Sequence, residues 1–351
     1  MVPSPDDARH ALIVVGASAG GVETLRELMA GLPATLPAAV LVVLHVGSRT
    51  PSVLPSILGR VSGLPVAQAR DGESIRPGRV YVAPPDVHLL VDGDRTRLVH
   101  GPRENGVRPA VDPLFRSAAD SYGRRVIGVV LSGTLDDGTA GLGRIKQRGG
   151  LAVVQDPDEA LFDGMPRSAA EHVPVDHIVP LAAMPALLAR LAGEVATART
   201  PTPMTDELES DRDLREIDGG ARQNEALGGT VSGFTCPECH GALWQIDDGA
   251  GVVRYRCRVG HTYAEDSLQE SKSISIEAAL WTALTALEEQ AALTWRMARR
   301  ADVAGNEERR VRYEERARLY EDRARILDAV LRTTPLAAAG RTVAAADTGA
   351  P

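Results

Sequence analysis

The sequence has few aromatic residues and no long apolar segment. Phe, Trp and Tyr together make up 3% of its 351 residues, so a core must be built from Ala, Val, Leu and Ile. No apolar run approaches the roughly 18 residues of a membrane-spanning helix. Residues 1–10 show no basic region before an apolar segment. We therefore expect no signal peptide, no direct membrane insertion and a cytoplasmic location.

The sequence also lacks an excess of positive charge and has few cysteines. Its formal net charge is −8. Because broad nucleic-acid binding requires a basic face, we expect no nucleic-acid partner. All three cysteines lie between residues 236 and 257. An odd, clustered set favours metal binding in a reducing compartment over a disulfide framework.

Residues 11–193 alternate between short β-branched segments and stretches of helical periodicity. The strand-like segments are 39–44, 80–82, 126–131 and 151–154, and the helical ones are 51–61, 113–122 and 138–148. This alternation predicts an α/β fold with a doubly wound, mainly parallel sheet. Asp92-Gly93-Asp94 separates two further short segments and predicts an inserted β-hairpin over residues 87–100.

The rest of the chain differs in composition from this α/β region. It divides into an N-terminal tail (1–10), a linker (194–230), a zinc-ribbon-like module (231–268), a helical hairpin or coiled coil (269–333) and a disordered tail (334–351). In the hairpin, apolar residues recur at helical spacing, for example Ile276, Leu280, Leu284, Leu287 and Leu293. Either a solvated helical pair or an interface with a second copy or a signalling partner would explain this pattern.

The stretch Gly16-Ala17-Ser18-Ala19-Gly20 follows a β-branched segment and precedes a helical pattern. It fits the G-x-S-x-G nucleophile elbow, a sharp strand-to-helix turn that exposes a serine. Two other interpretations stay open. One is a dinucleotide-binding loop, although the G-x-G-x-x-G spacing and a Tyr-x-x-x-Lys pair are missing. The other is a structural turn with an incidental serine.

A serine becomes a nucleophile when a base and an orienting carboxylate accompany it. His45 directly follows the segment 39–44, and Asp136 and Asp137 follow the segment 126–131. Because parallel strands end at the same edge of a sheet, these side chains can meet Ser18. The competing interpretations are a structural histidine and carboxylates that cap the next helix.

Together these motifs resemble the catalytic domain of the bacterial chemotaxis protein-glutamate methylesterases, the CheB type. The motifs that carry the resemblance along residues 11–193 are Val15–Gly21, Leu44-His45, Ala83–His88, Arg108–Asp112, Leu131–Gly133, Asp137-Gly138 and Asp163–Pro166. The resemblance implies a triad of Ser18 as nucleophile, His45 as general base and acid, and Asp137 as the residue that orients His45. It also implies hydrolysis of glutamate γ-methyl esters, and deamidation of certain glutamines, on chemoreceptor-like proteins without a catalytic cofactor.

Two features depart from the family pattern. We expect the N–H of Ala19 to be the first oxyanion donor. The family's second donor lies in a Gly-Met-Gly segment, which here reads Gly133-Thr134-Leu135, so Thr134 would donate instead, with Met165 also at the substrate loop. The family usually carries an N-terminal receiver domain. Since only residues 1–10 precede the first strand segment, we expect no control by phosphorylation in cis.

Cys236-Pro-Glu-Cys239 and Cys257-Arg-Val-Gly-His261 have the spacings of zinc ligands. Each short spacing lets two side chains reach one ion, and four ligands complete a tetrahedron. We therefore expect a structural zinc ion held by Cys236, Cys239, Cys257 and His261. His240 is the alternative fourth ligand, and three free cysteines beside a chance histidine are the alternative to any site.

Two classes of function follow from these observations. One is a serine hydrolase whose ribbon and helices recruit a partner or dimerise the chain. The other is a catalytically weak or inactive scaffold of the methylesterase fold, which binds signalling partners through its ribbon and helices. The intact Ser18, His45 and Asp137 favour the hydrolase, because a scaffold needs none of them.

Overall fold

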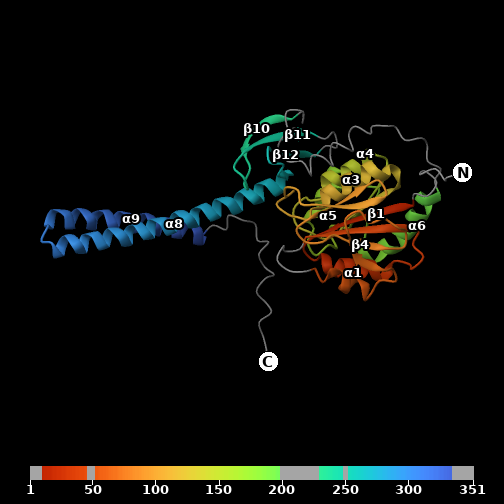
Figure 1. The fold of residues 1–351 in the computed structure, drawn as a ribbon, viewed down its shortest axis with the longest axis horizontal. Coiled ribbons are helices and arrows are strands. Elements are labelled where there is room, and N and C mark those ends of the chain that lie inside the picture. The colour runs from red at the N-terminus through yellow and green to blue at the C-terminus, as the bar shows by residue number, and fades with distance from the viewer. Residues whose placement is uncertain (1–9, 46–51, 198–228, 248–251, 334–351) are drawn as a thin grey trace, which may run out of the picture. The chain divides into compact units, whose positions relative to one another are not determined.

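The structure is a computed structural model that describes residues 10–45, 52–197, 229–247 and 252–333 (Figure 1). The chain divides into two compact units, Met1–Leu268 and Gln269–Pro351. The predicted C-terminal tail, nearly all of the N-terminal tail and most of the linker lie outside the described residues.

A seven-stranded sheet forms the centre of the first unit (Figure 1), in the order β3-β4-β2-β1-β7-β8-β9. All its neighbouring strands pair in parallel, which confirms the predicted sheet. The strands are β1 (Ala11–Ala17), β2 (Ala38–Leu44), β3 (Val66–Gln68), β4 (Val80–Val82), β7 (Val126–Val130), β8 (Leu151–Gln155) and β9 (His177–Val179). Every residue of β1 and β2 is buried, as expected for strands covered on both faces.

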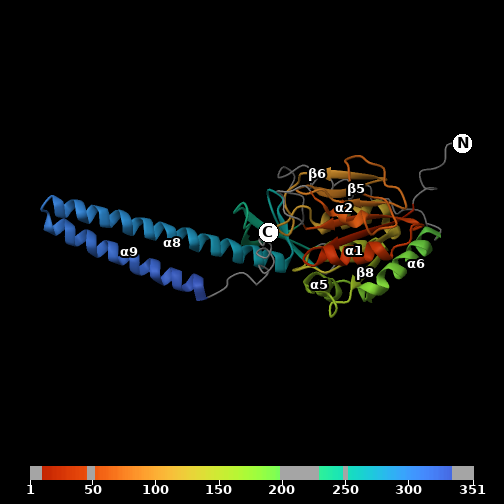
Figure 2. The same ribbon diagram turned by 90° about the horizontal axis from the view of Figure 1, so that it is seen from below.

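Helices cover both faces of this sheet. On one face, Ile13 and Val15 of β1 pack in a core with α1 (Gly21–Gly31), α2 (Leu54–Gly59) and α6 (Met184–Thr197) (Figure 2). On the other, Leu12 and Val14 pack in a core with α3 (Val111–Tyr122), α4 (Thr139–Gln147) and α5 (Gly164–His172). Short 3₁₀ turns lie at η2 (Gly123–Arg125) and η3 (Leu181–Ala183). The alternation of side chains along β1 therefore separates two apolar cores.

Two local predictions differ in detail from the structure. The inserted hairpin is present as β5 (His88–Asp92) and β6 (Arg95–Val99), paired antiparallel. The helix predicted over residues 51–61 is shorter in the structure, where α2 spans Leu54–Gly59. Pro55 lies in its first turn, the position where a missing N–H costs no helical hydrogen bond.

The cysteine segment folds as a four-stranded antiparallel sheet within the first unit. Its strands are β10 (Thr230–Thr235), β11 (Ala242–Asp247), β12 (Val253–Cys257) and β13 (Thr262–Tyr263). A small cluster of buried side chains, which includes Leu243 and Tyr263, forms its core. We call residues 230–263 the ribbon.

Two long helices follow, α8 (Glu265–Val303) and α9 (Glu307–Thr333), separated near Gly305 as predicted. Buried positions along them recur every seven residues. On α8 they form two series, Leu284, Ala291 and Ala298, and Thr294 and Ala301; on α9 they are Ala317 and Ala324. Such spacing is typical of a coiled-coil seam. Ile276 and Leu293, from the predicted apolar stripe, are half exposed instead. None of the described helices is both long and apolar enough to span a membrane.

Candidate active site and metal centre

The first candidate site lies at the edge of the sheet where β1, β2 and β7 end. Ala17 of β1 is paired with Leu44 of β2, so Ser18 and His45 leave the sheet side by side. The N–H of His45 donates to the carbonyl of Ala17 (3.2 Å), and the N–H of Ser18 donates to the carbonyl of Ser132 after β7 (3.0 Å). Parallel pairing therefore brings the three loops together.

Ser18, His45 and Asp137 form a continuous hydrogen-bonded chain. The Oγ of Ser18 lies 3.0 Å from Nδ1 of His45, and Nε2 of His45 lies 2.7 Å from Oδ2 of Asp137. A proton on Nε2 is donated to the carboxylate, which leaves Nδ1 to accept the serine proton. The ring orientation is thus the reverse of the serine-protease arrangement, in which Nε2 faces the serine. The connectivity of the acid-base chain is the same.

Asp137 is held as a buried carboxylate. Its side chain lies at the N-terminus of α3, where Val111 and Asp112 donate backbone N–H groups to it at 2.7 and 3.2 Å. Helix N-termini favour such an anion. Burial by itself would raise the pKa of Asp137, but the hydrogen bond from His45, these backbone donors and the amide of Asn105 hold the pKa below its usual value. The residue is therefore ionised and can orient His45.

Asp136, the alternative partner of His45, has a different role. Its carboxylate accepts the backbone N–H of Asp266 (3.1 Å) and the hydroxyl of Ser267, both in the first turn of α8. Burial raises its pKa to about 6. Asp136 thus caps α8 and not the next helix in the chain, α4 (Thr139–Gln147), which the alternative interpretation expected. Asp137 is the carboxylate that reaches His45.

Sequence reasoning gave no role to two polar residues beside the triad, Asn105 and Asp112, although Asp112 lies in one of the matching motifs. The Nδ2 of Asn105 donates to Oδ1 of Asp137 (2.9 Å) and to Oδ2 of Asp112 (3.1 Å), while Oδ1 of Asp112 accepts the N–H of Gly141 (2.6 Å). Burial, followed by the nearby charge of Asp137, raises the pKa of Asp112 to about 8. The one local signal was the pair Asn105-Gly106, which is typical of a turn. Asn105 and Gly106 both have positive φ angles.

The expected oxyanion donors lie on the loops that flank Ser18. Among the residues described here, the backbone N–H groups of Ala19 and Thr134 donate no hydrogen bond, so both are free to bind an oxyanion. A Cβ on Gly133 would lie 2.9 Å from Cβ of Ser18 and 2.1 Å from Sδ of Met165. Only glycine fits there. Met165 is fully buried and donates its N–H to the carbonyl of Gly133, so it supports this loop from within.

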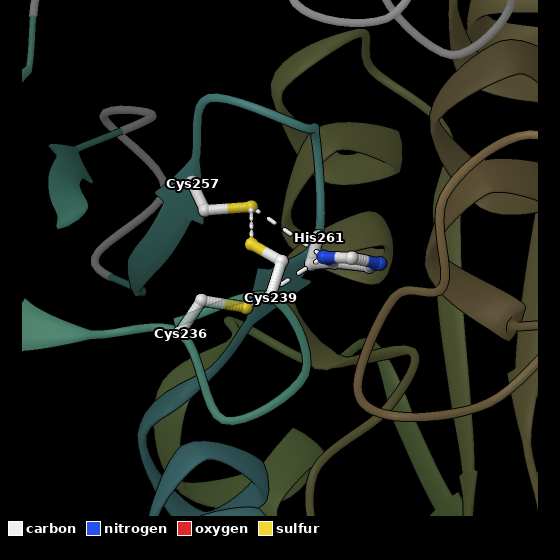
Figure 3. Close-up of side chains that lie close together, drawn as sticks. All are labelled: Cys236, Cys239, Cys257 and His261. Atoms are coloured by element: carbon white, nitrogen blue, oxygen red, sulfur yellow. Dashed lines mark hydrogen bonds between the residues drawn. The ribbon is translucent and has the colours of Figure 1, made fainter. Parts of the chain in front are cut away.

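The second candidate site is the cluster of cysteines and histidine in the ribbon (Figure 3). Cys236, Cys239, Cys257 and His261 point toward one another, and their ligand atoms all lie within 4.8 Å of one another. The Nδ1 of His261 lies 3.6 and 3.5 Å from the sulfurs of Cys236 and Cys257. In a tetrahedral zinc site with Zn–S bonds of about 2.3 Å, ligand atoms are separated by about 3.5–3.8 Å. His240 is exposed and lies outside the cluster.

The surroundings of the cluster also fit a metal ion. The Nε2 of His261 faces the carboxylate of Glu238 (3.3 Å), which in turn accepts the hydroxyl of Tyr263 (3.0 Å). Metal-bound histidines commonly use their second nitrogen in this way. The hydrogen bond from Cys257 lowers the pKa of Cys236 to about 3, and the one with Cys236 raises the pKa of His261 to about 9. Cys236 is therefore held as a thiolate, the form that binds a metal, by its neighbours Cys257 and His261.

Comparisons with known proteins match the α/β domain to one family. The family model for CheB methylesterase matches residues 13–188. A relative from Leptospira interrogans is 41% identical over 180 residues, which are 51% of this chain and 93% of the relative. The protein-glutamate methylesterase/protein-glutamine glutaminase 2 of Anaeromyxobacter dehalogenans is 40% identical over 184 residues, 52% of this chain and 54% of that protein.

A solved structure is also similar. It is the crystal structure of the Thermotoga maritima CheB methylesterase catalytic domain, with a TM-score of 0.51 and 34% identity. The match covers 52% of this chain and 100% of that domain. The chain thus spans nearly all of the Leptospira relative and of this domain, but about half the length of the Anaeromyxobacter protein. The ribbon and the two long helices α8 and α9 lie outside residues 13–188.

Proposed function

The chain belongs to the CheB methylesterase family, and on that premise we propose that it is a serine hydrolase of glutamate γ-methyl esters on chemoreceptor-like proteins. The observation that carries the proposal is the hydrogen-bonded chain from Ser18 through His45 to the buried, ionised Asp137. A structural turn would need none of these contacts, and a dinucleotide-binding loop would need no base beside the serine.

The first half of the reaction forms an acyl-enzyme. His45 takes the hydroxyl proton of Ser18 at Nδ1 as Oγ attacks the ester carbonyl, and Asp137 stabilises the imidazolium that results. The N–H groups of Ala19 and Thr134 bind the oxyanion of the tetrahedral intermediate. As the intermediate collapses, His45 returns the proton to the leaving oxygen and methanol departs.

The second half releases the product. A water molecule gives its proton to Nδ1 of His45 and attacks the acyl carbon. Collapse of this second intermediate restores the hydroxyl of Ser18 and frees a glutamate carboxylate. With a glutamine side chain in place of the ester, ammonia leaves in the first half and the second half is the same. No step requires a cofactor.

The test is methanol release from methylated chemoreceptor fragments by the full chain. We expect turnover by the wild type, loss of it in Ser18→Ala, and full retention in the matched control Ser273→Ala, whose serine lies on α8. Ser18 should also react covalently with a fluorophosphonate probe. If no methylated receptor yields methanol and Ser18 is not labelled, the hydrolase proposal is wrong and a binding scaffold on the same fold is the better account.

We further propose that the ribbon binds one structural zinc ion through Cys236, Cys239, Cys257 and His261. Support comes from the mutual approach of the four ligand atoms and from the carboxylate behind His261. Four protein ligands leave no open position, so the ion would stabilise the ribbon without reacting. Native mass spectrometry should give one zinc per chain, and none after Cys239→Ser.

A further inference from the structure

The ribbon is joined to the α/β domain by backbone hydrogen bonds. Thr262 of β13 forms a parallel bridge with Glu104, and its N–H donates to the carbonyl of Arg103 (3.3 Å). Its own carbonyl accepts the N–H of Asn105 (2.7 Å). Gly260, in the preceding turn, lies so close to the domain that an added Cβ would be 2.8 Å from Cγ of Pro102. The ribbon therefore lies directly against the segment 102–105.

Asn105 connects this contact to the triad. Its Oδ1 accepts the N–H of Ala264, immediately after β13 (2.9 Å), and its Nδ2 donates to Oδ1 of Asp137 (2.9 Å). Both ends of one amide are thus used, one by the ribbon's backbone and one by the carboxylate that orients His45. The residue is 8% exposed and has a φ of 52°, so its position depends on the groups around it.

The metal ligands lie next to this contact in the chain. The N–H of Cys257 donates to the carbonyl of His261 (3.0 Å), which closes the turn that carries two of the four ligands. Thr262 follows this turn directly. An ion bound by both Cys257 and His261 would therefore also restrain the adjacent backbone of Thr262, to which Asn105 is hydrogen-bonded.

We propose that Asn105 is a positioning residue through which the metal-bound ribbon holds Asp137 in place, so that metal occupancy sets the reactivity of Ser18. The proposal rests on the proposed role of Ser18 as nucleophile. Without the metal, the backbone at Thr262 and Ala264 loosens, Asn105 loses one anchor, and Asp137 loses a well-placed donor. Weakening one hydrogen bond to a buried charge corresponds to a loss of about tenfold or more in rate.

The experiment uses the full chain and the rate constant for labelling of Ser18 by a fluorophosphonate, measured with zinc bound and after removal by a chelator. Asn105→Gly removes the side chain and tolerates the positive φ. Asn105→Asp keeps the acceptor for Ala264 but loses the donor to Asp137. The matched control is Asn306→Gly, the same change at the residue that caps the N-terminus of α9, in the other unit.

We expect zinc removal to slow labelling of the wild type and of Asn306→Gly about tenfold. Both Asn105 variants should retain one zinc, label about tenfold more slowly than the wild type, and change less than twofold on zinc removal. In ester hydrolysis they should lower kcat at an unchanged KM. A merely structural role for Asn105 would lower the zinc content or the melting temperature but leave the kcat of the folded, zinc-loaded enzyme unchanged.

Wild-type labelling that does not respond to zinc removal would overturn the proposal, and so would Asn105→Gly that keeps the wild-type response. If zinc removal also unfolds the α/β domain, the zinc-loaded variants decide, because rates equal to the wild type would exclude a positioning role. Normal, zinc-sensitive labelling without methanol release would refute the proposed substrate but leave this inference standing.

Discussion

Replacing Asp137 with Asn is the sharpest test of the acid-base chain. Four N–H donors surround the carboxylate, from His45, Val111, Asp112 and Asn105. An amide offers one acceptor oxygen and one NH₂ group. In either orientation of the amide, the NH₂ group must therefore face two of these donors.

The structure gives the size of the effect. Leaving two buried donors without an acceptor costs roughly 1–3 kcal/mol each, so we expect a loss of about 2–6 kcal/mol in the free energy of unfolding. For a domain of this size that corresponds to a fall of about 4–24 °C in melting temperature. Loss of the orienting carboxylate of a serine hydrolase lowers kcat by about 10⁴-fold, and we expect 10³–10⁴-fold here.

Methanol release at saturating substrate and thermal unfolding measure the two effects. Asp136→Asn is the control, because the hydroxyl of Ser267 can accept from the new NH₂ group while the amide oxygen accepts from Asp266. We expect its kcat to stay within about threefold of the wild type. If Asp137→Asn retained a tenth of the wild-type kcat, Asp137 would not be the residue that orients His45.

Three further predictions concern the metal, a buried ion pair and pH. Cys239→Ser, or zinc removal by a chelator, should speed hydrogen exchange throughout the ribbon while the central strands of the α/β sheet stay protected, as measured by mass spectrometry. Glu104→Gln removes one charge of the buried ion pair with Arg116 and should cost about 3–5 kcal/mol in urea unfolding. Glu194→Gln, in an exposed pair, should cost nothing measurable. Burial raises the folded-state pKa of Asp136 to about 6 from 3.8. Between about pH 4 and pH 6, the folded chain therefore keeps a proton that the unfolded chain releases. The free energy of unfolding should fall by up to about 3 kcal/mol across this range because of Asp136. The difference in urea midpoint between wild type and Asp136→Asn, measured across this range, should show that slope, and a flat difference would contradict it.

Local sequence patterns were enough to predict the α/β fold and the meeting of Ser18 with His45. The apolar strand segments are continuous because the sheet is covered on both faces, and the positions directly after parallel strands share one edge. The metal-ligand spacings that begin at Cys236 and Cys257 could be recognised from the sequence for a similar reason. Two residues separated by a short turn can reach one ion almost regardless of the rest of the fold.

Spacing rules alone could not choose between adjacent residues or between the faces of a helix, although the family resemblance implied Asp137. Asp136 and Asp137 are adjacent in the sequence, and what separates them is that one faces α8 and the other faces His45. The helical stripe of α8 contained Leu284, which is buried in the seam, but also Leu293, which is half exposed. Helical periodicity shows which residues share one side of a helix, but it does not show whether another element will cover that side.

Asn105 shows most clearly what the sequence alone leaves undetermined. Its neighbours in space are 32 residues away at Asp137 and 159 residues away at Ala264. A composition or spacing rule reads only one short stretch, and within its own stretch Asn105 is an ordinary turn residue. Its connection to both the triad and the ribbon exists because packing brings three distant segments together, where a buried amide must satisfy its donors and its acceptor at once.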